Sequence, residues 1–231
     1  MKDGAPGHFR VQGQINIDPG TGPRHIAIRD NILFTVHETA STLTAQQIPG
    51  APNGTTFPLI ANVSIIPPES SNFNGSFFGA EILISEPTDR FPDPLIYVSN
   101  RNLGPDFDPR GDSIAIFEFK NSSLGAVTAD SGSVSSSRRR FHARDFQERQ
   151  DITVVNTITG NFVLQAQVFT GLRQIRSMAL GKVADGGDEF LIAGANLDGG
   201  VAVLQRIDGG RNLTVVARNE DIANRTSFVF L

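Results

Sequence analysis

Short apolar runs recur along the whole chain, with turn-forming residues between them. The runs are rich in Val, Ile, Phe and Leu, and no segment keeps a helical period over three turns. Several runs alternate, so that Ile114 and Ile116 share one face of their expected strand. The pattern predicts an all-β protein. The expected strands cover residues 9–17, 25–28, 32–38, 43–48, 80–85, 95–100, 113–119, 152–158, 162–169, 177–183, 189–196, 200–207, 213–218 and 227–231.

Three stretches of the chain repeat one order of elements, beginning near Gly22, Gly79 and Gln174. In each, a start bearing Gly or Arg leads into a short apolar strand, a turn, a second strand that ends in Asn or His, and a third strand. A repeated unit of three strands plus an outer fourth is typical of a propeller blade, whose apolar face is covered only by its neighbour. A β-sandwich is the alternative, although it does not require this ordered recurrence.

Residues 121–150, between the second and third units, lack a strand period and include a Ser-rich run followed by three arginines. We interpret them as a long exposed insertion loop within a single partial propeller domain that spans residues 1–231. Without this loop the chain is long enough for about four blades of roughly 45 to 50 residues each.

Charge and composition narrow the possible partners. The formal net charge of −4 favours neither nucleic acid nor an acidic membrane surface. No apolar stretch approaches the roughly 20 residues of a membrane-spanning helix. The absence of Cys excludes disulfides, thiolate metal sites and thiol nucleophiles. No phosphate loop, dinucleotide fingerprint or serine nucleophile elbow is present, and we expect neither a metal nor a cofactor.

The chain contains six Asn-x-Ser/Thr sequons, which indicate a secreted glycoprotein. The alternative is that a chain rich in Asn, Ser and Thr contains such triplets by chance. The first residues lack the apolar region of a signal peptide, so we expect the natural protein to contain a preceding segment that is missing here. Asn62 lies in an apolar run, where burial would leave it unmodified. The sequon residues are Asn53, Asn62, Asn74, Asn121, Asn212 and Asn224.

Several short motifs carry a family resemblance in their order and spacing. They are Gly-Pro-Arg-His at 22–25, Ala-Glu-Ile at 80–82, Tyr-Val-Ser-Asn-Arg at 97–101, Asp-Ser-Ile-Ala-Ile-Phe at 112–117, Arg176, and Ala-Asn at 195–196. Over most of its length the chain resembles the seven-bladed propeller lactonase family, which includes fungal carboxy-cis,cis-muconate cyclase and the propeller type of 6-phosphogluconolactonase. The resemblance implies an incomplete β-propeller, the C-terminal part of a longer ring. The chain departs from the family pattern where Gln174-Ile175 replaces a common Pro before Arg176, and where His37 replaces a common Asn.

The same resemblance implies a site at the mouth of the central channel, where the inner strands of neighbouring blades converge. It implies His25 and Glu81 as proton-transfer residues and Arg101 and Arg176 as anion-binding residues, with Arg24 joining them if it faces the channel. Acid–base residues and arginine forks suit either closure of a carboxymuconate to a lactone or hydrolysis of a lactone. The expected substrate is a small anionic lactone or carboxylate.

Structural roles remain alternatives for these residues. His25 could be a hydrogen-bonded core residue, and the arginines could be ion-pair partners that hold blades together. A buried Glu81 needs an Arg partner or a raised pKa. His37 and Glu38 lie at a strand end, where we expect a pair at the rim of the propeller rather than part of the site. For the whole protein, the alternative is a non-catalytic secreted glycoprotein used for binding or display. Exposed blade edges predict self-association.

Overall fold

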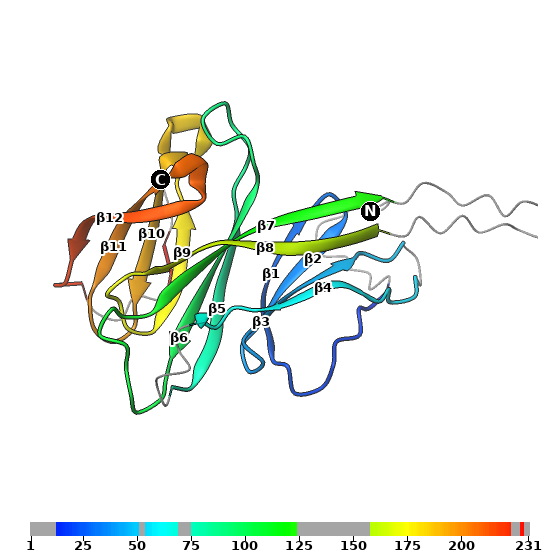
Figure 1. The fold of residues 1–231 in the computed structure, drawn as a ribbon, viewed down its shortest axis with the longest axis horizontal. Coiled ribbons are helices and arrows are strands. Elements are labelled where there is room, and N and C mark those ends of the chain that lie inside the picture. The colour runs from blue at the N-terminus through cyan, green and yellow to red at the C-terminus, as the bar shows by residue number, and fades with distance from the viewer. Residues whose placement is uncertain (1–12, 51–53, 69–74, 124–157, 223–226, 229–231) are drawn as a thin grey trace, which may run out of the picture.

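The computed structural model describes residues 13–50, 54–68, 75–123, 158–222 and 227–228. Within these ranges the chain forms three four-stranded antiparallel sheets and no α-helix (Figure 1). Sheet 1 contains β1 (Pro23–Arg29), β2 (Ile32–His37), β3 (Thr42–Gln47) and β4 (Leu59–Ser64). Sheet 2 contains β5 (Phe77–Ile84), β6 (Leu95–Asn102), β7 (Ser113–Ser123) and β8 (Ile158–Phe169). Sheet 3 contains β9 (Ile175–Leu180), β10 (Phe190–Ala195), β11 (Val201–Ile207) and β12 (Asn212–Asn219), with the 3-10 turns η2 (Val183–Asp185), η3 (Gly187–Glu189) and η4 (Asp208–Gly210).

The strands of each sheet lie in chain order, as in a propeller blade. The first strands, β1, β5 and β9, contact one another in sequence, and the outer strands β4 and β12 both contact β8. Figure 1 shows sheet 3 on the left, sheet 2 in the centre and sheet 1 on the right. This arrangement confirms the prediction of an all-β, incomplete propeller of the lactonase type.

Apolar side chains fill the spaces between successive sheets. In β6, Ile96 and Val98 face sheet 1, whereas Leu95 and Tyr97 face sheet 3, so both faces of sheet 2 are buried. The cluster between sheets 1 and 2 contains Ile32, Phe34, Val36, Leu43, Ala45, Ile82, Ile96, Val98, Ala115 and Phe117. The cluster between sheets 2 and 3 contains Leu95, Tyr97, Ile114, Ile116, Leu191, Ala193, Ala202 and Leu204.

Three expectations from the sequence need correction. Residues 13–17 and 227–228 form no strand, because an apolar alternation becomes a strand only beside a pairing partner, and the remainder of those two predicted strands lies outside the described residues. Strand β7 continues to Ser123 by pairing Asn121 with Gly160, so 121–123 are not loop. The rest of the predicted insertion, 124–150, is also outside the described residues. The described residues form three four-stranded sheets, and long hairpins such as β7–β8 take up more of the chain than the expected length of roughly 45 to 50 residues per blade allowed; the prediction of about four blades referred to the whole chain.

None of the helices in the described part of the chain is long and apolar enough to cross a bilayer.

Candidate active site at the inner strands

The innermost strand of each sheet carries a β-bulge near its start, where its ladder with the next strand shifts register. Bulges commonly redirect side chains beside functional sites. The residues at these shifts are Arg24 in β1, Ala80 and Glu81 in β5, and Arg176 in β9. Because β1, β5 and β9 contact one another in this order, the bulges gather charged side chains from all three sheets.

His25, which directly follows the bulge of β1, contacts the carboxylate of Glu81 in the next sheet. Its Nδ1 lies 2.7 Å from Oε1 of Glu81. The Glu81 side chain is 14% exposed and that of His25 is 40% exposed, so the carboxylate is buried beneath an imidazole that reaches solvent. The backbone N–H of Ile82 also donates to Oε1 of Glu81, at 3.3 Å, and the Glu81 N–H donates to Oγ of Ser99, at 2.9 Å.

Burial raises the pKa of Glu81, while the nearby charges of His25 and Arg24 and the Ile82 N–H oppose that shift. A buried Glu81 was expected to need an Arg partner or a raised pKa; burial raises its pKa, and its hydrogen-bonded partner is a histidine. An ionised Glu81 accepts a hydrogen bond from Nδ1–H of His25. In the neutral imidazole, a hydrogen on Nδ1 leaves a lone pair on Nε2. The pair therefore presents Nε2 as a general base.

Glu38 lies between two of the arginines. Its Oε2 is 3.6 Å from Nη1 of Arg24, and its Oε1 accepts a hydrogen bond from Nη2 of Arg101. Nε of Arg24 donates to the Ala80 carbonyl at 3.2 Å, which ties sheet 1 to the bulge of sheet 2. Burial lowers the pKa of Arg24, and the charges of Arg101 and Arg176 lower it further. The guanidinium group of Arg24 thus lies close enough to those of Arg101 and Arg176 to be repelled by both.

The three arginines differ in their availability to a ligand. The side chain of Arg101 is 4% exposed and is held by Glu38 and by the Gly79 carbonyl, at 3.5 Å. Arg176 is half-buried and has no hydrogen-bond or ion-pair partner within the part of the chain that the structure describes. Arg101 interacts with the carboxylates of Glu38 and Asp112, and Arg24 with those of Glu38 and Glu81, whereas Arg176 has no such partner among the described residues. Arg176, with Arg24 beside it, therefore suits an anion.

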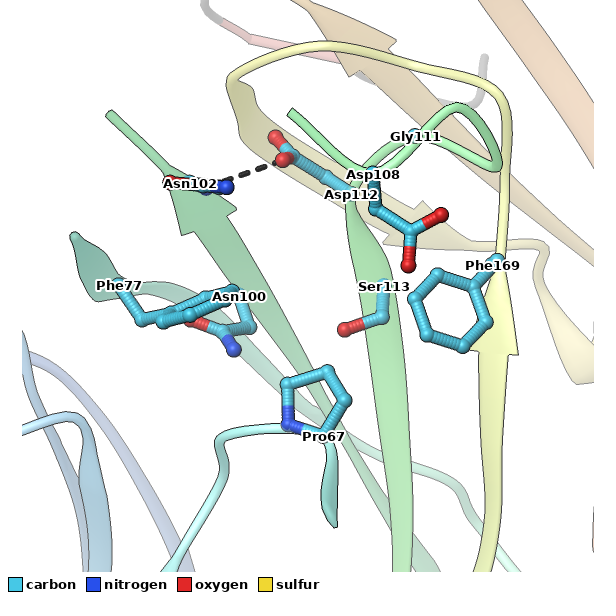
Figure 2. A pocket seen from close by; sticks show the side chains of 9 residues that line it. All are labelled: Pro67, Phe77, Asn100, Asn102, Asp108, Gly111, Asp112, Ser113 and Phe169. Carbon is cyan, nitrogen blue, oxygen red and sulfur yellow. Dashed lines mark hydrogen bonds between the residues drawn. The ribbon is translucent and has the colours of Figure 1, made fainter. Parts of the chain in front are cut away.

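The start of β9, which carries Arg176, is fastened by Asp112 of sheet 2. Figure 2 shows Asp112 beside a small cavity, with a hydrogen bond from Asn102. Oδ1 accepts this bond from the Asn102 N–H at 3.0 Å, and Oδ2 accepts bonds from the N–H groups of Gln174 at 2.5 Å and Ile175 at 3.2 Å. Burial raises the pKa of Asp112 to about 6, although these three donors favour the carboxylate.

The structure places Glu81 in contact with His25, and Arg176 near Arg24, while the roles that the resemblance implies for them stay predictions. It assigns Arg101 to a buried ion pair behind them. Glu38 was missed as a site residue, because the sequence pattern favoured the rim. The signal that could have found it is its position directly after β2, whose last residue pairs with the first residue of β1.

No group of three or more His, Asp or Glu residues could hold a metal ion in the ranges that the structure covers. Of the sequon residues, Asn62 in β4 and Asn121 in β7 are exposed, so the expected burial of Asn62 is wrong. Asn212 is half-buried, and its Oδ1 accepts the Leu213 N–H at 2.8 Å. Asn53, Asn74 and Asn224 lie outside the described residues.

Comparison with solved structures supports the same architecture. A protein from Lactobacillus plantarum superposes with a TM-score of 0.58 at 17% identity, over 92% of this chain and 46% of that one. A candidate 6-phosphogluconolactonase from Bacteroides fragilis gives 0.54 at 14% identity, over 92% of this chain and 43% of that one. The periplasmic gluconolactonase of Pseudomonas aeruginosa gives 0.54 at 12% identity, over 91% and 42%. The chain therefore spans less than half the length of these structures.

The chain has no significant match among curated proteins. The family model described as "Lactonase, 7-bladed beta-propeller" matches residues 3–147, which is more than half of the chain. This match includes the strands that carry His25, Glu81 and Arg101. The protein belongs to the seven-bladed β-propeller lactonase family.

Proposed function

We propose that this protein hydrolyses a small anionic lactone without a cofactor, using His25 as the general base. The observation that carries the proposal is the 2.7 Å contact between His25 Nδ1 and Glu81 Oε1, beside the guanidinium groups of Arg24 and Arg176. Membership of the lactonase family and the fold shared with a gluconolactonase support this reaction class.

In the first step, Nε2 of His25 takes a proton from a water molecule as its oxygen bonds to the lactone carbonyl carbon. Glu81 accepts the Nδ1 hydrogen bond throughout, which orients the imidazole and stabilises the imidazolium that forms. The carbonyl oxygen becomes an oxyanion. Arg176, which has no other partner among the described residues, is placed to stabilise that charge.

In the second step, the carbonyl re-forms and the ring C–O bond breaks. The departing ring oxygen takes the proton from Nε2 of His25, which restores the neutral imidazole. Water has then supplied a hydroxyl group to the carbonyl carbon and a proton to the ring oxygen, so the product is the open hydroxy acid. Arg24 suits a carboxylate or phosphate elsewhere on the substrate, because its guanidinium group can form a paired hydrogen bond with either anion.

Closure of a carboxymuconate to a lactone is the second candidate, and the raised pKa of Glu81 favours it. In that reaction a substrate carboxylate adds across a carbon–carbon double bond while a proton is delivered to the adjacent carbon. A carboxyl that keeps its proton to higher pH is better able to supply one through His25. The arginines would again hold the substrate carboxylates.

A pH-stat assay with glucono-δ-lactone and its 6-phosphate tests hydrolysis, and the absorbance of carboxymuconate tests cyclisation. We expect His25→Gln and Glu81→Gln to lower kcat by roughly 10²- to 10⁴-fold. Glu86→Gln, an exposed carboxylate just beyond the end of β5, is the matched control and should leave kcat unchanged. If no substrate turns over above the blank, or if the two variants match the unmodified protein, the proposal fails and the non-catalytic binding or display role is favoured.

A further inference from the structure

A second cavity, of about 280 Å³, lies on the face of sheet 1 that is turned away from sheet 2. Phe34 and Val36 of β2 pack into the cluster shared with sheet 2, so the alternate residues Thr35 and His37 point to the opposite face. The floor of the cavity contains Thr35, His37, Thr42, Thr44 and Gln46, and its wall and roof include Asn62, Ile17, Asp18, Thr56, Phe57 and Leu59.

This floor is polar, although it is as buried as the apolar faces between the sheets. Thr35, His37, Thr44 and Gln46 are each at most 6% exposed. The roof is anchored to the floor, because Nε2 of Gln46 donates to the Phe57 carbonyl at 2.5 Å. Hydrogen bonds between residues 14–16 and Thr56 join the two roof segments. The cavity is therefore preformed.

Several polar groups of the floor lack partners. Nε2 of His37 is 2.9 Å from Oγ1 of Thr44, but the buried Nδ1 of His37 has no partner among the described residues. The Thr35 and Thr42 hydroxyls likewise form no hydrogen bond within the ranges that the structure covers. Buried polar groups in folded proteins are almost always hydrogen-bonded. This floor thus offers donors and acceptors to a molecule inside the cavity.

The lining also restricts the charge of that molecule. Among the described residues that line it there is no Lys or Arg, and Asp18 is the only acidic one. Burial lowers the pKa of His37, with Asp18 opposing the shift, which favours a neutral imidazole. Hydroxyl and amide groups both donate and accept hydrogen bonds, as the hydroxyls of a polyol do. Phe57 adds an apolar surface for the C–H face of a ring.

We propose that this cavity binds a neutral monosaccharide or cyclic polyol through Thr35, His37, Thr42, Thr44 and Gln46. This site is separate from the arginine cluster and does not depend on lactonase activity. Its chemistry selects uncharged, hydroxyl-rich molecules, whereas the arginine cluster selects anions.

Isothermal titration calorimetry with methyl β-D-glucopyranoside and with myo-inositol tests the proposal, since neither probe is a lactone or an anion. The variant Thr35→Val/Thr42→Val removes two hydroxyls while keeping side-chain shape and strand preference. We expect it to raise the Kd about tenfold or more, as loss of two hydrogen bonds predicts. Thr39→Val, in the exposed β2–β3 turn outside the lining, should leave the Kd unchanged, as should His25→Gln.

The unfolding midpoint of each variant shows whether it is folded. If the double variant is unfolded, the binding measurement uses the single variant Thr42→Val instead. A measurement on the unmodified protein needs no variant: saturation with either probe should shift the ¹⁵N resonances of the His37 ring. The proposal is overturned if neither probe binds, or if the Kd is unaffected by loss of the Thr42 hydroxyl.

Discussion

The carboxylate of Asp112 lies 2.5 Å from the backbone nitrogen of Gln174, so a residue of sheet 2 holds the segment that leads into sheet 3. Gln174 has a φ of 60°, a left-handed conformation that a residue with a side chain rarely adopts. The hydrogen bonds from Gln174 and Ile175 to Asp112 hold the backbone in this conformation directly before Arg176. The position of Arg176 in the site therefore depends on Asp112, which belongs to another sheet.

The free energy of unfolding should depend on the protonation of Asp112. Its pKa is raised from 3.8 to about 6 by burial, so between these values the folded chain binds more protons than the unfolded chain. The carboxyl group therefore stabilises the fold most below pH 4, and its contribution falls as the pH rises through 6, by up to about 3 kcal/mol. Asn at this position cannot titrate.

Denaturant unfolding of the unmodified protein and of Asp112→Asn at several values between pH 4 and pH 7 measures this effect. The stability of the unmodified protein relative to the variant should decline over the interval. A difference that stays flat or grows with pH would contradict a raised pKa.

Replacing Arg176 by Gln should slow hydrolysis of an anionic lactone more than it changes the fold, because Arg176 is assigned to the oxyanion. A charge-assisted hydrogen bond contributes about 1.5–3 kcal/mol, which corresponds to a fall in kcat of roughly 10- to 150-fold. Arg173→Gln is the matched control, because Arg173 also lies near the start of β9 but pairs with Asp198 at 3.4 Å. Steady-state kinetics should show a lower kcat only for Arg176→Gln, and equal effects of the two changes would remove Arg176 from the site.

Sheets 1 and 2 approach each other too closely at Gly79 for any larger residue. A Cβ atom there would lie 2.7 Å from Cγ2 of Val36 and 3.0 Å from the His37 carbonyl oxygen. Gly79→Ala should therefore force the sheets apart and cost about 1–3 kcal/mol. Gly186→Ala is a useful comparison, since no atom lies within 4 Å of its added Cβ and only its positive φ opposes the change. Thermal unfolding that ranks Gly79→Ala as the milder change would refute the close contact.

Secretion and glycosylation remain proposals, for which the exposed sequon residues provide a test. In a eukaryotic secretory host, we expect Asn121 in β7 to carry a glycan, because its side chain is exposed. Half-buried Asn212, whose Oδ1 already accepts the Leu213 N–H, should carry less. Mass spectrometry of tryptic peptides before and after enzymatic deglycosylation measures both occupancies. An unmodified Asn121 would argue against the expected compartment.

Local patterns predicted most of the strands, although they missed β4, the outer strand of sheet 1. The alternation in residues 113–119 and the threefold recurrence of strands depend on side chains close together in sequence, and both correspond to observed strands. His25 and Glu81 were found because short motifs resemble a family pattern. The link from Arg101 through Glu38 to Arg24 could not be found this way, since it depends on the pairing of β1 with β2 and on the contact between two sheets.

The cavity on sheet 1 illustrates the same limit. The sequence displays alternating polar residues at Thr35 and His37 and again at Thr42 and Thr44. Alternation shows that these side chains share a face, but not what covers that face. Only the fold shows that residues 16–18 and 56–59 close over them and leave a space.

The register shifts of the inner strands separate the reactive groups from the contacts that hold the sheets together. The charged residues Arg24, Glu81 and Arg176 lie at the irregular positions of β1, β5 and β9, whereas the regular ladders carry most of the apolar packing. A substitution at an irregular position can therefore alter which compound is recognised without repacking the interior. Proteins built this way can diversify in specificity while keeping one scaffold.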